Sequence, residues 1–109
     1  MQIIVNADDF GMTANKNRAI DQLMRKGICT NASLVVNTAY SDEAVRLAYE
    51  GGYQDRISLH LNLTEGQALS DDIKKIPLYY EKGAFVHRAI IRQNKQVYPF
   101  HIVAVRNEV

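Results

Sequence analysis

The sequence predicts an α/β fold in which three parallel strands alternate with two helices, in the order βαβαβ. Two observations lead to this prediction. Short runs of β-branched and leucine residues alternate with longer amphipathic segments, and a glycine follows each amphipathic segment. The chain has 109 residues, which is a usual size for one domain, so we expect a single domain over residues 1–109.

The first strand, the first helix and the second strand are predicted in residues 2–36. Residues 2–7 contain three consecutive β-branched residues, which is typical of a strand buried on both faces of a parallel sheet. Residues 15–26 place apolar side chains every three or four positions, which predicts an amphipathic helix that Gly27 ends. Residues 32–36 return to an apolar run and predict the second strand.

The second helix and the third strand follow the same pattern. Ser41 or Asp42 is expected to cap a helix that ends at the two glycines 51 and 52. Residues 57–63 alternate Ile or Leu with polar residues, which predicts a strand with one apolar and one polar side. Because a parallel strand is normally covered on both sides, the polar row favours a binding site or the lumen of a barrel.

The pattern is weaker after residue 63. Residues 70–76 predict a short helix, and Gly83 marks a turn. Residues 84–93 have a helical pattern, and Pro99 is placed to begin one more helix. That last pattern continues to the end of the sequence without a stop signal, so we expect the chain to be part of a longer protein.

The composition excludes several classes of protein. Thirteen Lys and Arg oppose twelve Asp and Glu, so the net charge of +1 offers no bulk attraction to nucleic acid or to an anionic membrane. No apolar run is long enough to span a bilayer, and the first residues lack the basic start of a signal peptide. A single cysteine, Cys29, supports neither a disulfide framework nor a cysteine zinc site. We therefore expect a cytoplasmic protein with no nucleic-acid partner and no membrane association.

Polar residues stand at or just after the carboxyl end of each predicted strand. Ligands of parallel α/β folds bind at this end of the sheet, so we expect these residues to converge on one site. The candidate site residues are Asp8 and Asp9 after the first strand, Asn37 after the second, and His60, Asn62 and Thr64 on the third.

The adjacent carboxylates of Asp8 and Asp9 suit two different tasks. Neighbouring side chains of a strand point apart, so we expect one carboxylate to bind a divalent ion and the other to take a proton from water. His60 would add the nitrogen donor that zinc and other first-row ions bind. Two alternatives stay open: the aspartates form a charged turn before a helix, and His60 points to solvent. His87 and His101 are expected on the surface.

Three blocks of the sequence resemble a known family. Residues 4–11 (IVNADDFG) resemble the opening motif of the YdjC-like carbohydrate deacetylases, a family that includes the chitooligosaccharide deacetylase. Residues 27–37 (GICTNASLVVN) and 59–66 (LHLNLTEG) resemble the second and third strands of that family. The resemblance is clear as far as about residue 70 and fainter beyond it.

The resemblance implies a (β/α) barrel of the TIM-like deacetylase type. A complete barrel has about 250 residues, so the chain is identified as the N-terminal portion of such a deacetylase, in truncated form. The reaction implied is hydrolysis of the N-acetyl group of amino sugars or chitooligosaccharides with one divalent metal ion, Mg or Zn. By the same resemblance Asp9 and His60 would bind the metal, and Asp8 would be the catalytic base. Asn37, Asn62 and Thr64 are then expected to bind the N-acetylated sugar.

One feature of the family is missing from the sequence. The family supplies a third metal ligand from a later motif of the kind His-x-Asp-x-His-His, and the chain has no such motif. A non-catalytic truncated module that self-associates through an open sheet edge is therefore the alternative, and we expect a homo-oligomer. A phosphoesterase using the two aspartates is a weaker reading, because no phosphate-binding loop accompanies them.

Overall fold

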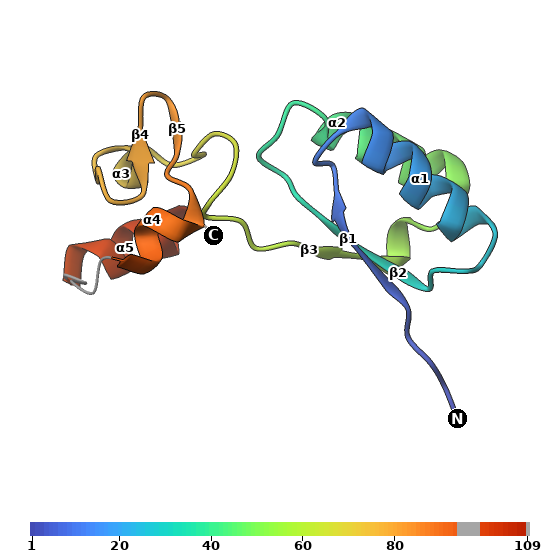
Figure 1. Ribbon diagram of the computed structural model, residues 1–109. Helices are drawn as coiled ribbons and strands as arrows, with labels where there is room; N and C mark the ends of the chain where they lie inside the picture. The colour runs from blue at the N-terminus through green and yellow to red at the C-terminus, as the bar shows by residue number, and fades with distance from the viewer. Residues whose placement is uncertain (94–98, 109) are drawn as a thin grey trace. The chain divides into compact units, whose positions relative to one another are not determined.

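The computed structural model describes residues 1–93 and 99–108, and it confirms the α/β class (Figure 1). The chain forms two compact units, residues 1–60 and residues 61–109, in the stretch for which the sequence predicts one domain. Each unit has its own hydrophobic core. In the described residues no helix is long and apolar enough to cross a membrane.

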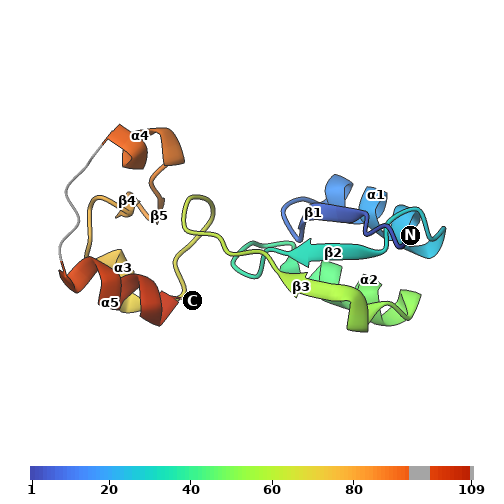
Figure 2. The same cartoon turned by 90° about the horizontal axis from the view of Figure 1, so that it is seen from below.

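The N-terminal unit has the predicted βαβαβ order. Its three strands are parallel and lie in the order β1-β2-β3. Figures 1 and 2 show that both long helices lie on the same face of this sheet. The elements are β1 (Asn6–Phe10), α1 (Ala14–Arg25), β2 (Asn31–Leu34), α2 (Ser41–Gly51), the 3-10 helix η1 (Gln54–Arg56) and β3 (Ile57–Leu59).

The two helices begin in different ways. The Thr13 side chain accepts a hydrogen bond from the backbone N–H of Lys16 and so caps α1. Helix α2 begins at Ser41 itself after Tyr40, whose side chain makes no capping bond, so the prediction that Ser41 or Asp42 is the N-cap was wrong. Two acidic residues in the first turn of α2, Asp42 and Glu43, stabilise the start of this helix instead, because their negative charge interacts favourably with the positive end of the helix dipole.

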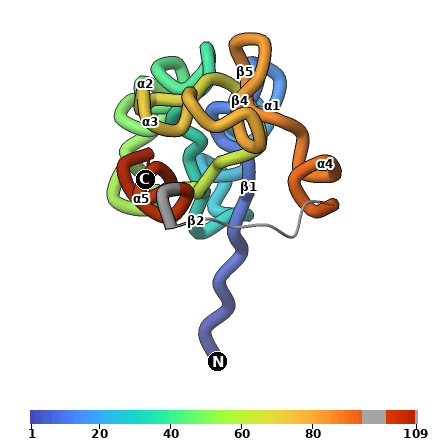
Figure 3. Tube along the Cα trace, turned by 90° about the vertical axis from the view of Figure 1, so that its left-hand side faces the viewer, coloured from blue at the N-terminus to red at the C-terminus, as the bar shows by residue number. Residues whose placement is uncertain are grey.

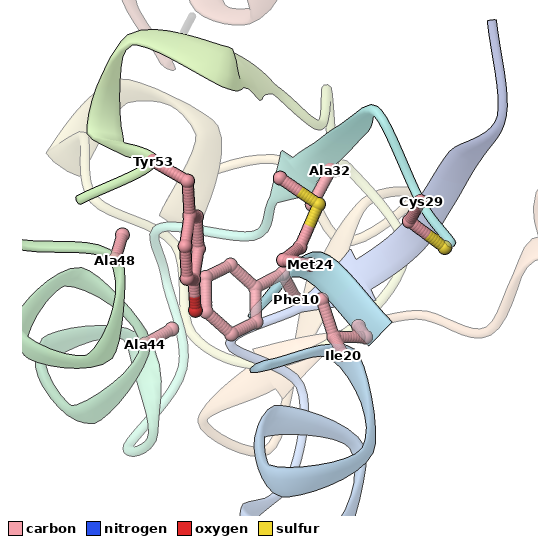
Figure 4. Close-up of a cluster of buried hydrophobic side chains, with 8 residues drawn as sticks. All are labelled: Phe10, Ile20, Met24, Cys29, Ala32, Ala44, Ala48 and Tyr53. Atoms are coloured by element: carbon pink, nitrogen blue, oxygen red, sulfur yellow. The ribbon is translucent and has the colours of Figure 1, made fainter. Parts of the chain in front are cut away.

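The core of the N-terminal unit lies between the sheet and the two helices (Figure 4). The rings of Phe10 and Tyr53 have centroids 6.4 Å apart, and neither residue is exposed. Tyr53 donates a 2.7 Å hydrogen bond to Asp21, and burial together with this bond raises the pKa of Tyr53 above its ordinary range. The buried residues of this core are Phe10, Ile20, Met24, Cys29, Ala32, Ala44, Ala48 and Tyr53.

The first predicted strand was placed too early in the chain. Residues 1–5 form no strand, and β1 begins at Asn6. The N-terminal end extends away from the sheet (Figure 3), while the Val5 carbonyl still accepts from the backbone N–H of Asn31 at the start of β2. Ile3 and Ile4 are 64% and 76% exposed, although the sequence predicts a run buried on both faces. The physical reason is that the helices cover one face of the sheet, and β1 is an outer strand of it.

The third predicted strand was too long for the same reason. It ends at Leu59 rather than at residue 63, and Leu59 is 58% exposed. Ile57 alone of the strand's apolar residues packs against the core of the unit. On the face away from the helices this sheet carries polar side chains, among them Ser33 and Ser58, which are paired in register.

The C-terminal unit consists of short elements. They are α3 (Asp71–Lys74), β4 (Tyr80–Glu81), β5 (Ala84–Phe85), α4 (Arg88–Gln93) and α5 (Pro99–Glu108). The strands β4 and β5 form a hairpin whose turn contains Lys82 and Gly83, both with positive φ, as a type I′ turn requires. The helix predicted over residues 70–76 forms after a Ser70 cap, and the helix predicted to begin at Pro99 is confirmed. The helix predicted over residues 84–93 is in part wrong, because its first two residues form β5.

The two remaining histidines of this unit differ in exposure. His87 is exposed, as predicted. His101 was predicted to lie at the surface but is 5% exposed, with its ring edge-on to Tyr79 at a centroid distance of 5.5 Å. Its place on α5 explains the difference, because α5 packs against α3 and so buries this side of the helix.

Candidate functional site

The site begins at an irregularity in β1. Ala7 pairs with Ala32 and Phe10 pairs with Leu34, so three steps along β1 match two steps along β2. The extra residue makes a β-bulge, and Asp9 within it has a φ of +66°. A bulge changes the direction of the side chains that follow it, and bulges are common beside active sites.

Asp8 is held in place by two hydrogen bonds to one of its oxygens. The Ser33 hydroxyl donates to Asp8 Oδ1 at 2.7 Å, and the Asn6 side-chain amide donates to the same oxygen at 2.8 Å. Ser33 Oγ also lies 3.2 Å from His60 Nδ1. Ser33, which is 7% exposed, therefore connects the aspartate of β1 to the histidine that follows β3.

Asp9 lies near the same nitrogen of this imidazole. Its Oδ1 is 3.8 Å from His60 Nδ1, and its Oδ2 accepts a 2.7 Å hydrogen bond from Lys16 Nζ. Lys16 stands in the first turn of α1 and was not among the predicted site residues. The side chains of Asp9 and Lys16 are 35% and 48% exposed, so this ion pair contributes little to stability.

The bulge thus brings together the residues that the sequence singles out first. Both carboxylates reach the surroundings of His60, although adjacent side chains of a regular strand point apart. The reason is the extra residue, which rotates Asp9 relative to its neighbour. The alternative in which His60 simply points to solvent does not describe these contacts.

A buried asparagine supports the turn after the bulge. Asn17 on α1 is not exposed, and its Oδ1 accepts a 2.7 Å hydrogen bond from the N–H of Gly11. Its amide nitrogen donates to the carbonyl of Tyr40 at 3.0 Å and to Glu43 Oε2 at 2.8 Å. Gly11 has a φ of +93°, and a Cβ there would lie 2.6 Å from the carbonyl oxygen of Val35. These contacts fasten the turn to both helices, and sequence reasoning missed them because they join distant parts of the chain.

The other predicted site residues are divided between the two units. Asn37, which is 8% exposed, follows β2 in the chain and has interactions of its own. Asn62 and Thr64 belong to the C-terminal unit. There Asn62 Oδ1 accepts from the backbone N–H of Thr64 and of Glu65, and its amide donates to the carbonyl of Glu65, so its side chain shapes a turn.

Asp9 and His60 supply an oxygen and a nitrogen donor side by side. Those are the donor types that zinc and other first-row divalent ions take from proteins. Within residues 1–93 and 99–108, no three His, Cys, Asp or Glu side chains are grouped so that they could hold an ion. Among the described residues, Asp9 and His60 could therefore supply two ligands of a metal site but not a complete set.

Comparison with known proteins identifies related chains. The YdjC-like protein family matches residues 2–109. A carbohydrate deacetylase of Danio rerio is 35% identical over 78% of this chain and 26% of its own length. A carbohydrate deacetylase of Brevibacillus brevis is 40% identical over 70% of this chain and 30% of its own length. A chitooligosaccharide deacetylase of Proteus mirabilis is 40% identical over 62% of this chain and 26% of its own length.

The fold of the chain matches a solved structure as well. A crystal structure from Enterococcus faecalis, described as that of a cellobiose-phosphate cleavage protein, superposes with a TM-score of 0.78 at 26% sequence identity. The match covers 96% of this chain and 39% of the other. The chain spans between a quarter and a third of the length of the three curated relatives above.

Proposed function

The chain belongs to the YdjC-like protein family, and from this we propose that it carries part of the active site of a metal-dependent carbohydrate deacetylase. The substrate class would be N-acetylated amino sugars or chitooligosaccharides, because the curated relatives are named carbohydrate and chitooligosaccharide deacetylases. The structural observation that carries the proposal is the position of His60, whose Nδ1 lies 3.2 Å from Ser33 Oγ, the partner of Asp8, and 3.8 Å from Asp9 Oδ1.

Each residue of the group has a task in this proposal. Asp9 and His60 would hold one divalent ion, Mg²⁺ or Zn²⁺. Such an ion when bound polarises a carbonyl, and Zn²⁺ also lowers the pKa of its water to about 7. Asp8 would act as general base and take a proton from the attacking water. Ser33 and Asn6 fix the oxygen of Asp8 to which they donate, so the carboxylate stays oriented toward its substrate.

The chemical balance of the reaction is simple. The oxygen of water bonds to the acetyl carbon while Asp8 receives the proton. The bond between the acetyl carbon and the sugar nitrogen then breaks, and the nitrogen takes up the proton that Asp8 received. The products are acetic acid and a free amine, which in water become acetate and an ammonium ion. Asn37, Asn62 and Thr64 stay the predicted sugar-binding residues, and within its own unit Asn62 shapes a turn.

Zinc binding and acetate release test this proposal. Zinc affinity is measured by titration calorimetry on the 109-residue chain, and acetate release is followed on an N-acetylated chitooligosaccharide with added zinc or magnesium. We expect weak zinc binding that falls at least about tenfold in Asp9→Asn and in His60→Ala, because each removes one of two ligands. Asp8→Asn leaves both proposed ligands in place, so it should bind zinc more tightly than Asp9→Asn and His60→Ala do, and it should release no acetate.

Asp42→Asn is the matched control, because Asp42 is an exposed carboxylate in the first turn of α2. It should match the wild-type chain in both assays. Equal zinc affinity in the wild-type chain, in Asp9→Asn and in His60→Ala would contradict the proposed ligands. Acetate release that survives Asp8→Asn would contradict the proposed base.

The alternative, a non-catalytic module that self-associates through an open sheet edge, has one observation in its favour. Ile3, Ile4 and Leu59 are more than half exposed. Ile3 and Ile4 precede the outer strand β1 in the chain, and Leu59 belongs to the outer strand β3. Sedimentation velocity over a range of concentrations would show a dimer, and Ile4→Lys would weaken it. A chain that stays monomeric, or that releases acetate, would contradict this alternative.

A further inference from the structure

We infer that Ser33 is a positioning residue that fixes which nitrogen of His60 carries the ring proton. The Ser33 hydroxyl lies between Asp8 and His60, and it has only one hydrogen to donate. The side chain that receives this hydrogen determines the tautomer of the His60 ring. The consequence of this tautomer for metal binding rests on the proposed function. The assignment of the proton rests on the contacts alone.

The number of hydrogens between the three side chains leads to the assignment. A serine hydroxyl has one hydrogen to donate, and an ionised carboxylate can only accept. Because Ser33 Oγ lies 2.7 Å from Asp8 Oδ1, the hydroxyl hydrogen belongs between these two oxygens. Ser33 Oγ can then only accept from His60 Nδ1, which lies 3.2 Å away. His60 Nδ1 therefore carries a hydrogen.

The reverse arrangement is unfavourable. If Ser33 donated to His60, two oxygens 2.7 Å apart would face each other without a hydrogen between them. Ser33 is 7% exposed, so water has little access to relieve such a contact.

Asp9 favours the same proton position. Its Oδ1 lies 3.8 Å from the same ring nitrogen, and a negative oxygen there stabilises the nitrogen that bears a hydrogen. Asp8, through Ser33, and Asp9 directly thus act on His60 Nδ1 in the same direction. The lone pair of the neutral ring is left on Nε2.

This proton position gives Ser33 a role toward a metal ion. A histidine that binds a metal usually donates its other ring N–H to a nearby oxygen, and loss of that partner typically lowers metal affinity about 10–100-fold. The chain of bonds from His60 through Ser33 to Asp8 has this form. It would leave Nε2 as the ring nitrogen available to the ion, and it would couple the proposed base to the proposed ligand through one hydroxyl. Because Asp9 Oδ1 lies beside Nδ1 in this structure, the Asp9 side chain would turn toward Nε2 for both residues to bind one ion.

Nitrogen chemical shifts of His60 test the inference without any metal. In the ¹⁵N-labelled 109-residue chain at mildly alkaline pH, where imidazoles are neutral, long-range proton–nitrogen correlations distinguish the two tautomers. We expect a hydrogen on Nδ1 in the wild-type chain. Ser33→Ala should shift the population toward a hydrogen on Nε2, and Ser33→Thr, which keeps the hydroxyl, should restore the wild-type state.

Ser58→Ala is the matched control, because Ser58 pairs with Ser33 in register and its hydroxyl bonds to a backbone carbonyl. It should leave the His60 spectrum unchanged. A wild-type ring with its hydrogen on Nε2 would overturn the inference, and so would an unchanged tautomer in Ser33→Ala. Should Ser33→Ala fail to fold, the wild-type spectrum still decides the position of the proton, because a hydrogen on Nε2 there overturns the inference.

Zinc titration of the same variants separates this inference from the proposed function. Ser33→Ala is expected to lower zinc affinity about 10–100-fold, with recovery in Ser33→Thr. A hydrogen on Nδ1 without zinc binding would leave the inference standing and remove the metal site. Zinc binding with the hydrogen on Nε2 would do the reverse.

Discussion

Replacement of Asn17 by alanine should destabilise the N-terminal unit strongly. The variant removes three hydrogen bonds of a fully buried amide, and the N–H of Gly11 loses its 2.7 Å acceptor. A buried donor without a partner costs about 1–3 kcal/mol, and a bond to a charged group such as Glu43 contributes about 1.5–3 kcal/mol. Because Glu43 can turn to water, we expect a total loss of about 3 kcal/mol.

Urea unfolding followed by NMR measures this loss. The free energy of unfolding falls by about 1–3 kcal/mol per molar urea, so a loss of about 3 kcal/mol lowers the urea concentration at the unfolding midpoint by about 1–3 M. The midpoint is read from the amide signals of β2. Asn15→Ala is the control, since Asn15 is an exposed asparagine on the same helix, and it should shift the midpoint little. Equal midpoints in Asn17→Ala and Asn15→Ala would refute the claim that the buried amide fastens the turn.

Three further variants test other parts of the N-terminal unit. Gly11→Ala puts a Cβ 2.6 Å from the carbonyl oxygen of Val35 at a positive φ, so thermal unfolding should show a loss of about 2–4 kcal/mol. Met24→Ala empties a fully buried position and should cost about 2–5 kcal/mol in the same assay. The folded state raises the pKa of Tyr53, so its hydrogen bond stabilises the fold fully below the unfolded value of about 10 and progressively less above it. The stability advantage of the wild-type chain over Tyr53→Phe, about 1 kcal/mol, should therefore be constant below pH 10 and decline at higher pH.

The alternation of strands and helices could be predicted because it depends on local periodicity. Helix α1 begins at a threonine cap and ends just before a glycine with positive φ, and both signals stand in the sequence. The exposure of Ile3 and Ile4 could not be predicted in the same way. An apolar run indicates that a segment suits burial, but it does not say which other segment will cover it.

The site was predictable in its members more than in its geometry. Asp8, Asp9 and His60 follow from the rule that ligands bind at the carboxyl ends of parallel strands. The contact of Lys16 with Asp9 was missed because it depends on how α1 turns back over the strand after the bulge. The bulge itself has no distinct local pattern, since its extra residue becomes visible only against the register of β2.

The left-handed backbone at Asp9 limits which residues evolution can place there. Few side chains tolerate a positive φ, with asparagine and aspartate the usual exceptions besides glycine, while β-branched residues are strongly disfavoured. An exchange to asparagine would thus preserve the shape of the strand and remove the charge, whereas valine would distort the loop whatever its chemistry. Natural variation at this position should be narrow on conformational grounds, even in proteins that have lost the activity.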